Sequence, residues 1–351
     1  MPPEWAPHVA CYLAWPHNRD TWPGKFEVIP PIYADMVANI ARFEPVRLAV
    51  TDTTQLDEVR AMIRDAARRT KREAPGPLLP IDIFHLPTND AWARDHGPIF
   101  VNRLPTDAPA GPIQIALDWR FNSWGEKYGA FDLDDVVPQR LGLRYGFDVI
   151  EPGIVLEGGS IDVNGAGSLL TTESCLLNPN RNPSLTRADI EDYLRTYLGV
   201  TNVLWLGDGI AGDDTDGHID DLARFVAPDT IVTVAEDDPA DVNRAVLRDN
   251  LDRLRAMRDQ DARPFKIETL PMPPAVIYDG TRLPASYANF YIANRALLMP
   301  TFDAPTDALA AQALQRLFPN RRVVSVPSTD LIWGLGSVHC LSQQHPAPPA
   351  V

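Results

Sequence analysis

The chain has 351 residues, a formal net charge of −15 at pH 7 and 45% hydrophobic residues. This hydrophobic content is ordinary for a globular protein and supplies a sizeable core. The acidic balance argues against nucleic acid as a partner, since phosphates require basic patches, and it favours a cationic substrate through long-range attraction.

Helices and short strands are predicted to alternate along the whole chain. Apolar residues at helical spacing, as at Leu56, Val59 and Ile63, predict helices. Short apolar runs bounded by proline, glycine or polar residues predict strands. The predicted strands are residues 10–15, 46–50, 81–84, 99–101, 147–150, 203–206, 265–270 and 323–326, the last of them buried. The predicted helices are residues 32–43, 55–69, 132–141, 187–198, 240–257 and 306–318.

Polar motifs recur among these elements at intervals of roughly 50 to 70 residues. A helix leads to a strand, then to a polar motif, then to strand-turn-strand. The motifs contain Asp95, Glu157, His218, residues 287–290 and Cys340. Such a period predicts stacked or radially arranged units, and a radial arrangement would turn every motif towards one axis. An ordinary α/β chain is the alternative. No linker is evident, so we expect one domain over residues 1–351.

The first motif, residues 89–98, is expected in a loop or at a strand end between two predicted strands. Asp95 beside Trp92 offers a carboxylate with an aromatic face. This pair suits a flat cation, through bidentate hydrogen bonds and cation–π contact. A structural network in which the acids pair with Arg94 is the alternative interpretation.

Two further motifs bring more acids and a histidine. Two glycines after Glu157 allow close backbone approach, although a tight turn with an incidental glutamate has the same pattern. Residues 212–221 are the most acidic stretch and include Asp214. We expect a strand from His218 onward, which would turn His218 and Asp220 to one face. No metal is expected, because the calcium-loop pattern lacks its closing glutamate and no His-x-x-x-His pair is present.

Cys340 follows the turn Gly334-Leu335-Gly336, so little side-chain bulk separates its sulfur from a small molecule. With only Cys11 and Cys175 besides, the cysteines are too few and too far apart for a disulfide framework. We therefore expect a reduced, cytoplasmic setting. No signal peptide is evident, and no stretch approaches the ~20 apolar residues of a membrane helix.

Together these residues fit substitution at a guanidinium carbon. That carbon is poorly electrophilic, so a strong, soft nucleophile such as Cys340 is needed, and two carboxylates would hold the planar N–H groups. His218 would protonate the departing ammonia and then accept a proton from water, with Glu157 holding the imidazole. A bound cation would also raise the thiolate fraction of Cys340.

Seven motifs, in order along nearly the whole chain, resemble the agmatine deiminase family, which is allied to the Porphyromonas-type peptidylarginine deiminases. The resemblance implies a five-bladed α/β propeller of the pentein superfamily, no cofactor, and conversion of agmatine to N-carbamoylputrescine and ammonia, a step towards putrescine. It also implies Cys340 as nucleophile, His218 as acid and base, Glu157 as its partner, and Asp95 and Asp220 as guanidinium ligands. The motifs are residues 15–20, 89–95, 157–160, 176–183, 213–220, 287–294 and 339–344.

The far end of the substrate is less defined. We expect Trp92, Asp95, Trp119, Asp214 and Asp220 to bind the substrate. After residues 118–125 the loop is shorter than is usual in agmatine enzymes and looks closer to the peptidylarginine branch. Arg120 or Lys127 near the pocket mouth would attract a carboxylate, which agmatine lacks, but the interpretation of both as ordinary surface bases is favoured.

Other functions stay open. Within the superfamily they are a peptidylarginine or arginine deiminase and an amidinotransferase. From other classes they are a metal-dependent hydrolase and a non-catalytic guanidine-binding module. The sequence does not decide whether the chain forms a homo-oligomer.

Overall fold

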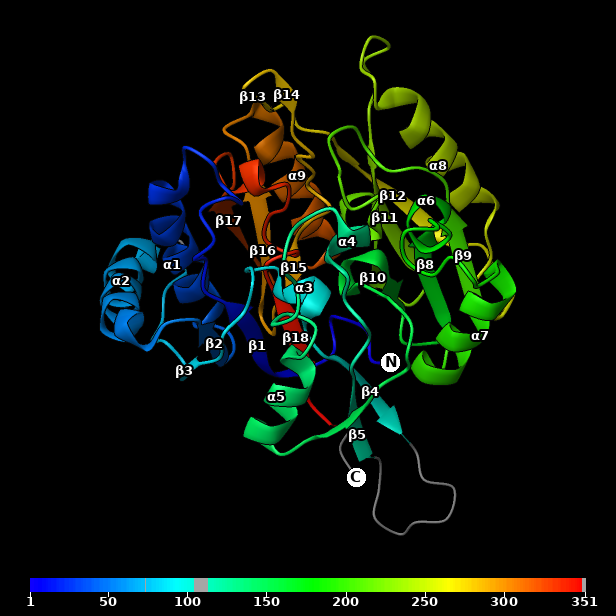
Figure 1. Ribbon diagram of the computed structural model, residues 1–351. Coiled ribbons are helices and arrows are strands. Elements are labelled where there is room, and N and C mark those ends of the chain that lie inside the picture. The colour runs from blue at the N-terminus through cyan, green and yellow to red at the C-terminus, as the bar shows by residue number, and fades with distance from the viewer. Residues whose placement is uncertain (73, 104–112, 349–351) are drawn as a thin grey trace.

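The computed structural model describes residues 1–72, 74–103 and 113–348, and Figure 1 shows its ribbon. The chain alternates helices with short strands, so the predicted α/β class is confirmed. Within the described residues, every helix is too short or too polar to span a lipid bilayer.

Five small sheets share one arrangement of strands. In each sheet two strands are antiparallel, and the second of them runs parallel to a third strand that follows a helix. The strand orders are β18-β1-β2-β3, β4-β5-β6, β7-β8-β9, β10-β11-β12 and β15-β16-β17. In the first sheet the antiparallel partner of β1 is β18, so the two ends of the chain meet there.

The strands of these sheets are β1 (His8–Ala14), β2 (Val46–Val50), β3 (Ile81–His85), β4 (Ile99–Arg103), β5 (Ile113–Leu117), β6 (Asp148–Ile150), β7 (Asp162–Val163), β8 (Ser168–Thr172), β9 (Asn202–Leu206), β10 (Ala223–Ala227), β11 (Thr230–Ala235), β12 (Lys266–Pro271), β15 (Tyr291–Ile292), β16 (Ala296–Thr301), β17 (Arg322–Pro327) and β18 (Gln343–Pro346). A separate hairpin is formed by β13 (Ile277–Tyr278) and β14 (Thr281–Arg282). The helices are α1 (Ile29–Ile40), α2 (Leu56–Arg69), α3 (Ala93–His96), α4 (Ser123–Glu126), α5 (Val137–Tyr145), α6 (Glu173–Leu176), α7 (Arg187–Leu198), α8 (Arg244–Ala256) and α9 (Pro305–Leu317).

The long helices pack between neighbouring sheets. Helix α8 contacts β11 of its own sheet and β9 of the sheet before it, and α9 likewise contacts β17 and β12. Residues of α7 share a buried cluster with β4 and β5, and residues of α5 share one with β3. The outer helices α2, α8, α7 and α5 lie around the periphery of Figure 1, and the short helix α3 lies near the middle of the view.

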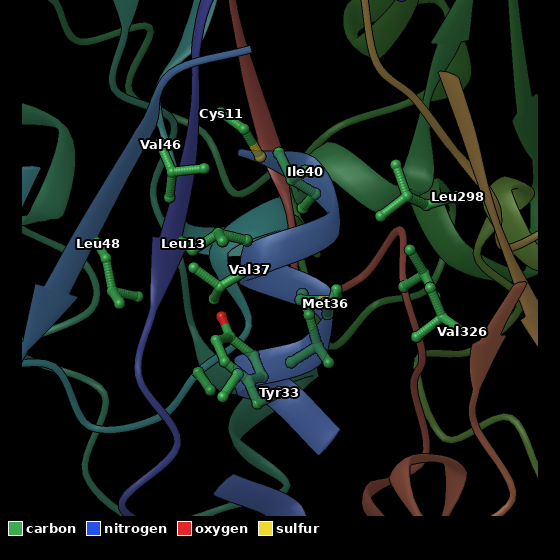
Figure 2. Packing of buried hydrophobic residues seen from close by; sticks show 14 of the residues in the cluster. Cys11, Leu13, Tyr33, Met36, Val37, Ile40, Val46, Leu48, Leu298 and Val326 are labelled. Carbon is green, nitrogen blue, oxygen red and sulfur yellow. The ribbon is translucent and has the colours of Figure 1, made fainter. Parts of the chain in front are cut away.

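Helix α1 joins the first sheet to the last. Figure 2 shows Leu13, Val46 and Leu48 on one side of this helix, and Leu298 and Val326 on its other side. Leu13 belongs to β1, and Val46 and Leu48 belong to β2. Leu298 belongs to β16 and Val326 to β17. Each of the five sheets is therefore linked through a helix to the next one, and the last is linked back to the first.

Several details differ from the sequence prediction, among them the bounds of α1 and α8, which were expected at residues 32–43 and 240–257. The stretch after His218 is the 3-10 turn Ile219–Asp221, because hydrogen bonds close within the turn, from Leu222 N to Ile219 O at 3.0 Å. The motif at residues 89–98 contains the one-turn helix α3 rather than only a loop. Helix α5 begins at Val137 and not at residue 132, because Pro138 suits a first helical turn. Strand β17 is buried on one face only, through Val324 and Val326.

Candidate active site

A pocket of about 960 Å³ opens where the polar motifs meet, with Cys340 and Asp95 among its lining residues. The motifs are tied together by hydrogen bonds between backbones and side chains. Arg94 N donates to Cys340 O at 3.1 Å, and His339 N donates to Asn289 O at 3.1 Å. The 3-10 turns after Glu157 and His218 contact each other, and the first of them also contacts α3. All five sequence motifs therefore come together, although they are far apart in the chain.

Cys340 sits at the pocket on a turn that needs its glycine. A side chain at position 336 would place a Cβ 2.5 Å from the Trp92 ring and 3.0 Å from the Cys340 Cβ, so only glycine fits. The sulfur accepts a hydrogen bond from Asn289 Nδ2 at 2.9 Å and lies 3.6 Å from Asp220 Oδ2. Burial raises the pKa of Cys340 well above its ordinary value, and nearby carboxylates add to the shift. The resting residue is therefore a thiol, which a cation beside it would help to ionise.

Asp95 is held by two donors. Its Oδ1 accepts from Gly159 N at 3.0 Å, and its Oδ2 accepts from Trp124 Nε1 at 3.0 Å. Burial raises the pKa of Asp95 to about 6, and the neighbouring acids Asp220 and Glu157 act in the same direction. The one-turn helix thus presents a firmly oriented carboxylate at the wall of the pocket.

His218 and Glu157 lie behind the pocket wall and are fully buried. The His218 Nδ1 atom is 3.7 Å from Asp95 Oδ1. Burial opposes the charged form of His218, but Asp95 and other neighbours outweigh this and raise its pKa well above the ordinary value. Arg181 Nε donates to Glu157 Oε1 at 2.7 Å, which leaves Glu157 Oε2 without a partner among the described residues.

Asp220 is oriented from one side only. Its Oδ2 contacts His339 Nδ1 at 2.7 Å, whereas Oδ1 has no hydrogen-bond partner in the described part of the chain. Burial alone would raise the pKa of Asp220, but the hydrogen bond and charge of His339 outweigh burial and lower it. This carboxylate is therefore ionised and has a free acceptor atom.

Gly159 allows these groups to gather. A Cβ at this position would lie 2.5 Å from His218 Nδ1, 2.8 Å from Asp95 Oδ1 and 3.1 Å from Asp220 Oδ2. All three contacts are shorter than ordinary van der Waals distances, so a larger residue would push the histidine and acids apart. The Glu-Gly-Gly motif therefore supplies the space that the charged groups occupy.

Three of the buried groups could also hold a metal ion. Donor atoms of Glu157, Cys175 and His218 lie within 4.8 Å of one another, and the set of carboxylate, thiolate and imidazole is one that Zn²⁺ accepts. The ion pair with Arg181 neutralises Glu157, which weakens its attraction for a cation. Cys175 is more than forty residues from His218 in the chain, so no ligand spacing in the sequence indicates this group.

The outer pocket contains further predicted residues. Asp214 lies in its lining and accepts a hydrogen bond from Tyr128. Lys127 also lines the pocket, and its Nζ contacts Asp216 Oδ1 at 2.7 Å. Trp92 also lies in the wall.

The structure does not bring Trp119 or Arg120 to the pocket. Trp119 is buried in an apolar cluster, where its ring centroid lies 5.7 Å from that of Tyr197. Arg120 is exposed and, like Trp119, is absent from the pocket lining. Trp124, five positions along, holds Asp95 instead, because the strained turn at α4 directs it inward (its φ is 54°).

Several residues of the site were not identified from the sequence. They are Trp124, Arg181, His339 and Glu4, of which the first three lie within or beside motifs already noted. Glu4 carries no local signal, since it lies in an ordinary-looking N-terminal stretch. Its contacts with the site arise only on folding.

Comparison with known proteins gives a consistent result. Residues 1–346 match the family model for Porphyromonas-type peptidyl-arginine deiminase. The agmatine deiminase of Pseudomonas syringae pv. tomato is 36% identical over 375 residues, covering 99% of this chain and 95% of the relative. That of Pseudomonas fluorescens strain SBW25 is 37% identical over 376 residues, covering 99% and 95%.

Solved structures agree in fold over the same extent. The agmatine deiminase of Enterococcus faecalis has a TM-score of 0.87 and 31% identity, covering 99% of this chain and 95% of that one. A Campylobacter jejuni agmatine deiminase with substrate bound has a TM-score of 0.86 and 30% identity, covering 99% and 96%.

Proposed function

Because the chain belongs to the Porphyromonas-type peptidyl-arginine deiminase family, we propose that it hydrolyses a small guanidino compound, with agmatine as the substrate. The products are then N-carbamoylputrescine and ammonia. Relatives across nearly the full length are agmatine deiminases, which supports a hydrolase acting on amidine C–N bonds.

One observation carries this proposal more than any other. The buried carboxylate atoms Asp220 Oδ1 and Glu157 Oε2 have no hydrogen-bond partner among the described residues, and Asp220 lies beside the Cys340 sulfur, with its Oδ2 3.6 Å away. A buried polar group left unpaired costs about 1–3 kcal/mol, and more if it is charged. A guanidinium ion offers several N–H donors in one plane, so it would satisfy acceptors of this kind.

In the proposed reaction the guanidinium lies between Asp95 and Asp220. Its charge lowers the pKa of the Cys340 thiol, which releases its proton to the solvent, and the thiolate forms a C–S bond to the guanidinium carbon. His218, as imidazolium, gives its proton to the departing nitrogen, and the C–N bond breaks to release ammonia. Glu157 and Asp95 stabilise the charged imidazole before that transfer.

The second half-reaction restores the enzyme. Neutral His218 accepts a proton from a water molecule, whose oxygen bonds to the carbon of the covalent thiouronium. The C–S bond then breaks, the sulfur leaves as thiolate and takes up the second proton of the attacking water, and the product is a neutral urea. The proton that the thiol released to the solvent converts the departed ammonia to ammonium, so the protons balance without a further reactant.

The outer pocket favours agmatine over arginine. Three acids line it beyond Asp95 and Asp134, namely Asp20, Asp90 and Asp214. Among the described residues its lysine and arginine are both paired with acids, Lys127 with Asp216 and Arg19 with Glu27. A substrate tail that ends in an ammonium group is attracted here, whereas a carboxylate tail meets no uncompensated cation.

The circuit of sheets supports the finer architecture. Five similar units, each linked to the next by a helix and the last linked to the first through α1, fit the five-bladed propeller of the pentein superfamily. One site drawing residues from all five units also fits a single catalytic domain over residues 1–351.

Ammonia release from a panel of guanidino compounds tests the function. We expect turnover of agmatine to exceed that of arginine and of peptides ending in arginine. Added glycine or putrescine should give no amidine-transfer product, and a chelator should leave the rate unchanged. Preference for the peptides would instead make the chain a peptidylarginine deiminase, and absence of ammonia from every compound would contradict the proposed hydrolysis.

A further inference from the structure

Beneath the candidate site, a histidine joins two carboxylates. The Nδ1 atom of His339 lies 2.7 Å from Asp220 Oδ2, and its Nε2 atom lies 2.8 Å from Glu4 Oε2. All three side chains are buried. A carboxylate accepts hydrogen bonds and cannot donate them, so His339 is the side chain that can donate in this row of contacts.

Glu4 is a fixed end for this chain of contacts. Its Oε2 also accepts a hydrogen bond from Arg224, and its Oε1 accepts from Ile292 N at 2.7 Å. Burial opposes the charge on Glu4, but Arg224 and His339 outweigh burial and hold its pKa well below the usual range. Arg224 in turn donates to Asp162 Oδ2 at 2.9 Å. The carboxylate of Glu4 is thus ionised and held at both oxygens.

We propose that Glu4 and His339 are positioning residues that orient Asp220 towards the substrate. His339 holds Asp220 Oδ2, which leaves Asp220 Oδ1 as the atom available to a guanidinium N–H. Because His339 precedes Cys340 directly, the same contacts set the position of Asp220 relative to the sulfur, which lies 3.6 Å from Oδ2. This inference rests on the proposed function, in which Asp220 binds the substrate headgroup.

The test uses two variants and one matched control. Glu4→Gln and His339→Gln each weaken one end of the Glu4–His339–Asp220 chain. Glu44→Gln is the control, because Glu44 forms a similar buried pair with His8 at 3.2 Å that reaches Glu4 only at its backbone oxygen, through His8 Nε2 at 2.7 Å, and does not touch Asp220. The Glu4→Gln change is isosteric, so it carries the test if His339→Gln does not fold.

Each variant is measured for kcat and KM with agmatine, for the inhibition constant of millimolar guanidinium ion, and for Tm. Guanidinium has no tail, so it reports on the headgroup site alone. We expect Glu4→Gln and His339→Gln each to raise KM and the inhibition constant of guanidinium by about tenfold to a hundredfold. A loss of this size is typical when a hydrogen bond to a charged group is removed. Glu44→Gln should leave KM and the inhibition constant of guanidinium unchanged, even if its Tm falls as far as that of the Glu4 and His339 variants.

Unchanged constants in the Glu4 and His339 variants would overturn the inference, and so would an equal rise in Glu44→Gln. The proposed function fails separately, if the wild-type protein releases no ammonia from agmatine. In that case the dissociation constant for guanidinium, measured by calorimetry on the same four proteins, still decides the role of Glu4 and His339. Absence of guanidinium binding to the wild-type protein would overturn both.

Discussion

Replacing Gly159 with alanine tests whether the charged groups need the space that they share. The new methyl group would lie 2.5 Å from His218 Nδ1 and 2.8 Å from Asp95 Oδ1. A Cβ in ordinary van der Waals contact lies at least 3.4 Å from such atoms, so the histidine and the aspartate must move by roughly 0.5–1 Å. Gly159 is not among the glycines with positive φ, so backbone strain does not contribute.

The magnitude follows from this displacement. Overpacking a well-packed interior costs about 1–3 kcal/mol of unfolding free energy. A misplacement of about 1 Å at a reacting centre costs roughly a hundredfold in rate. We therefore expect Gly159→Ala to lose about two orders of magnitude in kcat/KM for agmatine while the protein still folds.

The assay is ammonia release, with thermal unfolding measured in parallel. Gly207→Ala is the matched control, because its Cβ would meet the ends of Arg253 and Asp249 at 3.3 Å, and these surface side chains can move aside. The control should keep the wild-type rate. A rate for Gly159→Ala within twofold of the wild type would refute the reasoning that the three groups are packed against this glycine.

Three further predictions follow from the same geometry. Cys340→Ala and His218→Ala should each abolish ammonia release without loss of the folded state, as checked by circular dichroism; a wild-type rate in Cys340→Ala would rule out the thiolate mechanism. Trp124→Phe removes the donor to Asp95 Oδ2 and should raise KM about tenfold, whereas Trp119→Phe should leave KM unchanged, and the reverse order would show that the pocket is misassigned. Because the pKa of Asp95 is about 6 and only its carboxylate form binds a cation well, kcat/KM should fall about tenfold per unit as pH drops below 6. A profile that stays flat down to pH 4 would contradict that assignment.

Much of the site could be predicted from the sequence, because local constraints leave local signals. Gly336 and Gly159 are required where a Cβ would collide with the groups around them, and such glycines stand near the functional residue in the motifs of Asp95, Glu157, His218 and Cys340. Helix α7 was predicted with the correct bounds, since the Thr186–Asp189 capping box begins it and Gly199 ends it in the left-handed conformation. The acids, the histidine and the cysteine could be named for the same reason: their chemistry is uncommon, and their neighbours in the chain are distinctive.

Other features depend on contacts between residues that are distant in the chain. Trp119 and Trp124 lie in one motif, and only the packing of α4 decides that Trp124 faces Asp95 while Trp119 enters the apolar core. Glu4 and His339 are 335 positions apart, and no pattern near either one indicates that they meet. Residue types and local patterns in the chain are enough to identify the chemical groups and the turns that present them. The tertiary structure decided which oxygen of each acid is held and which is free, because that depends on side chains brought together from opposite ends of the chain.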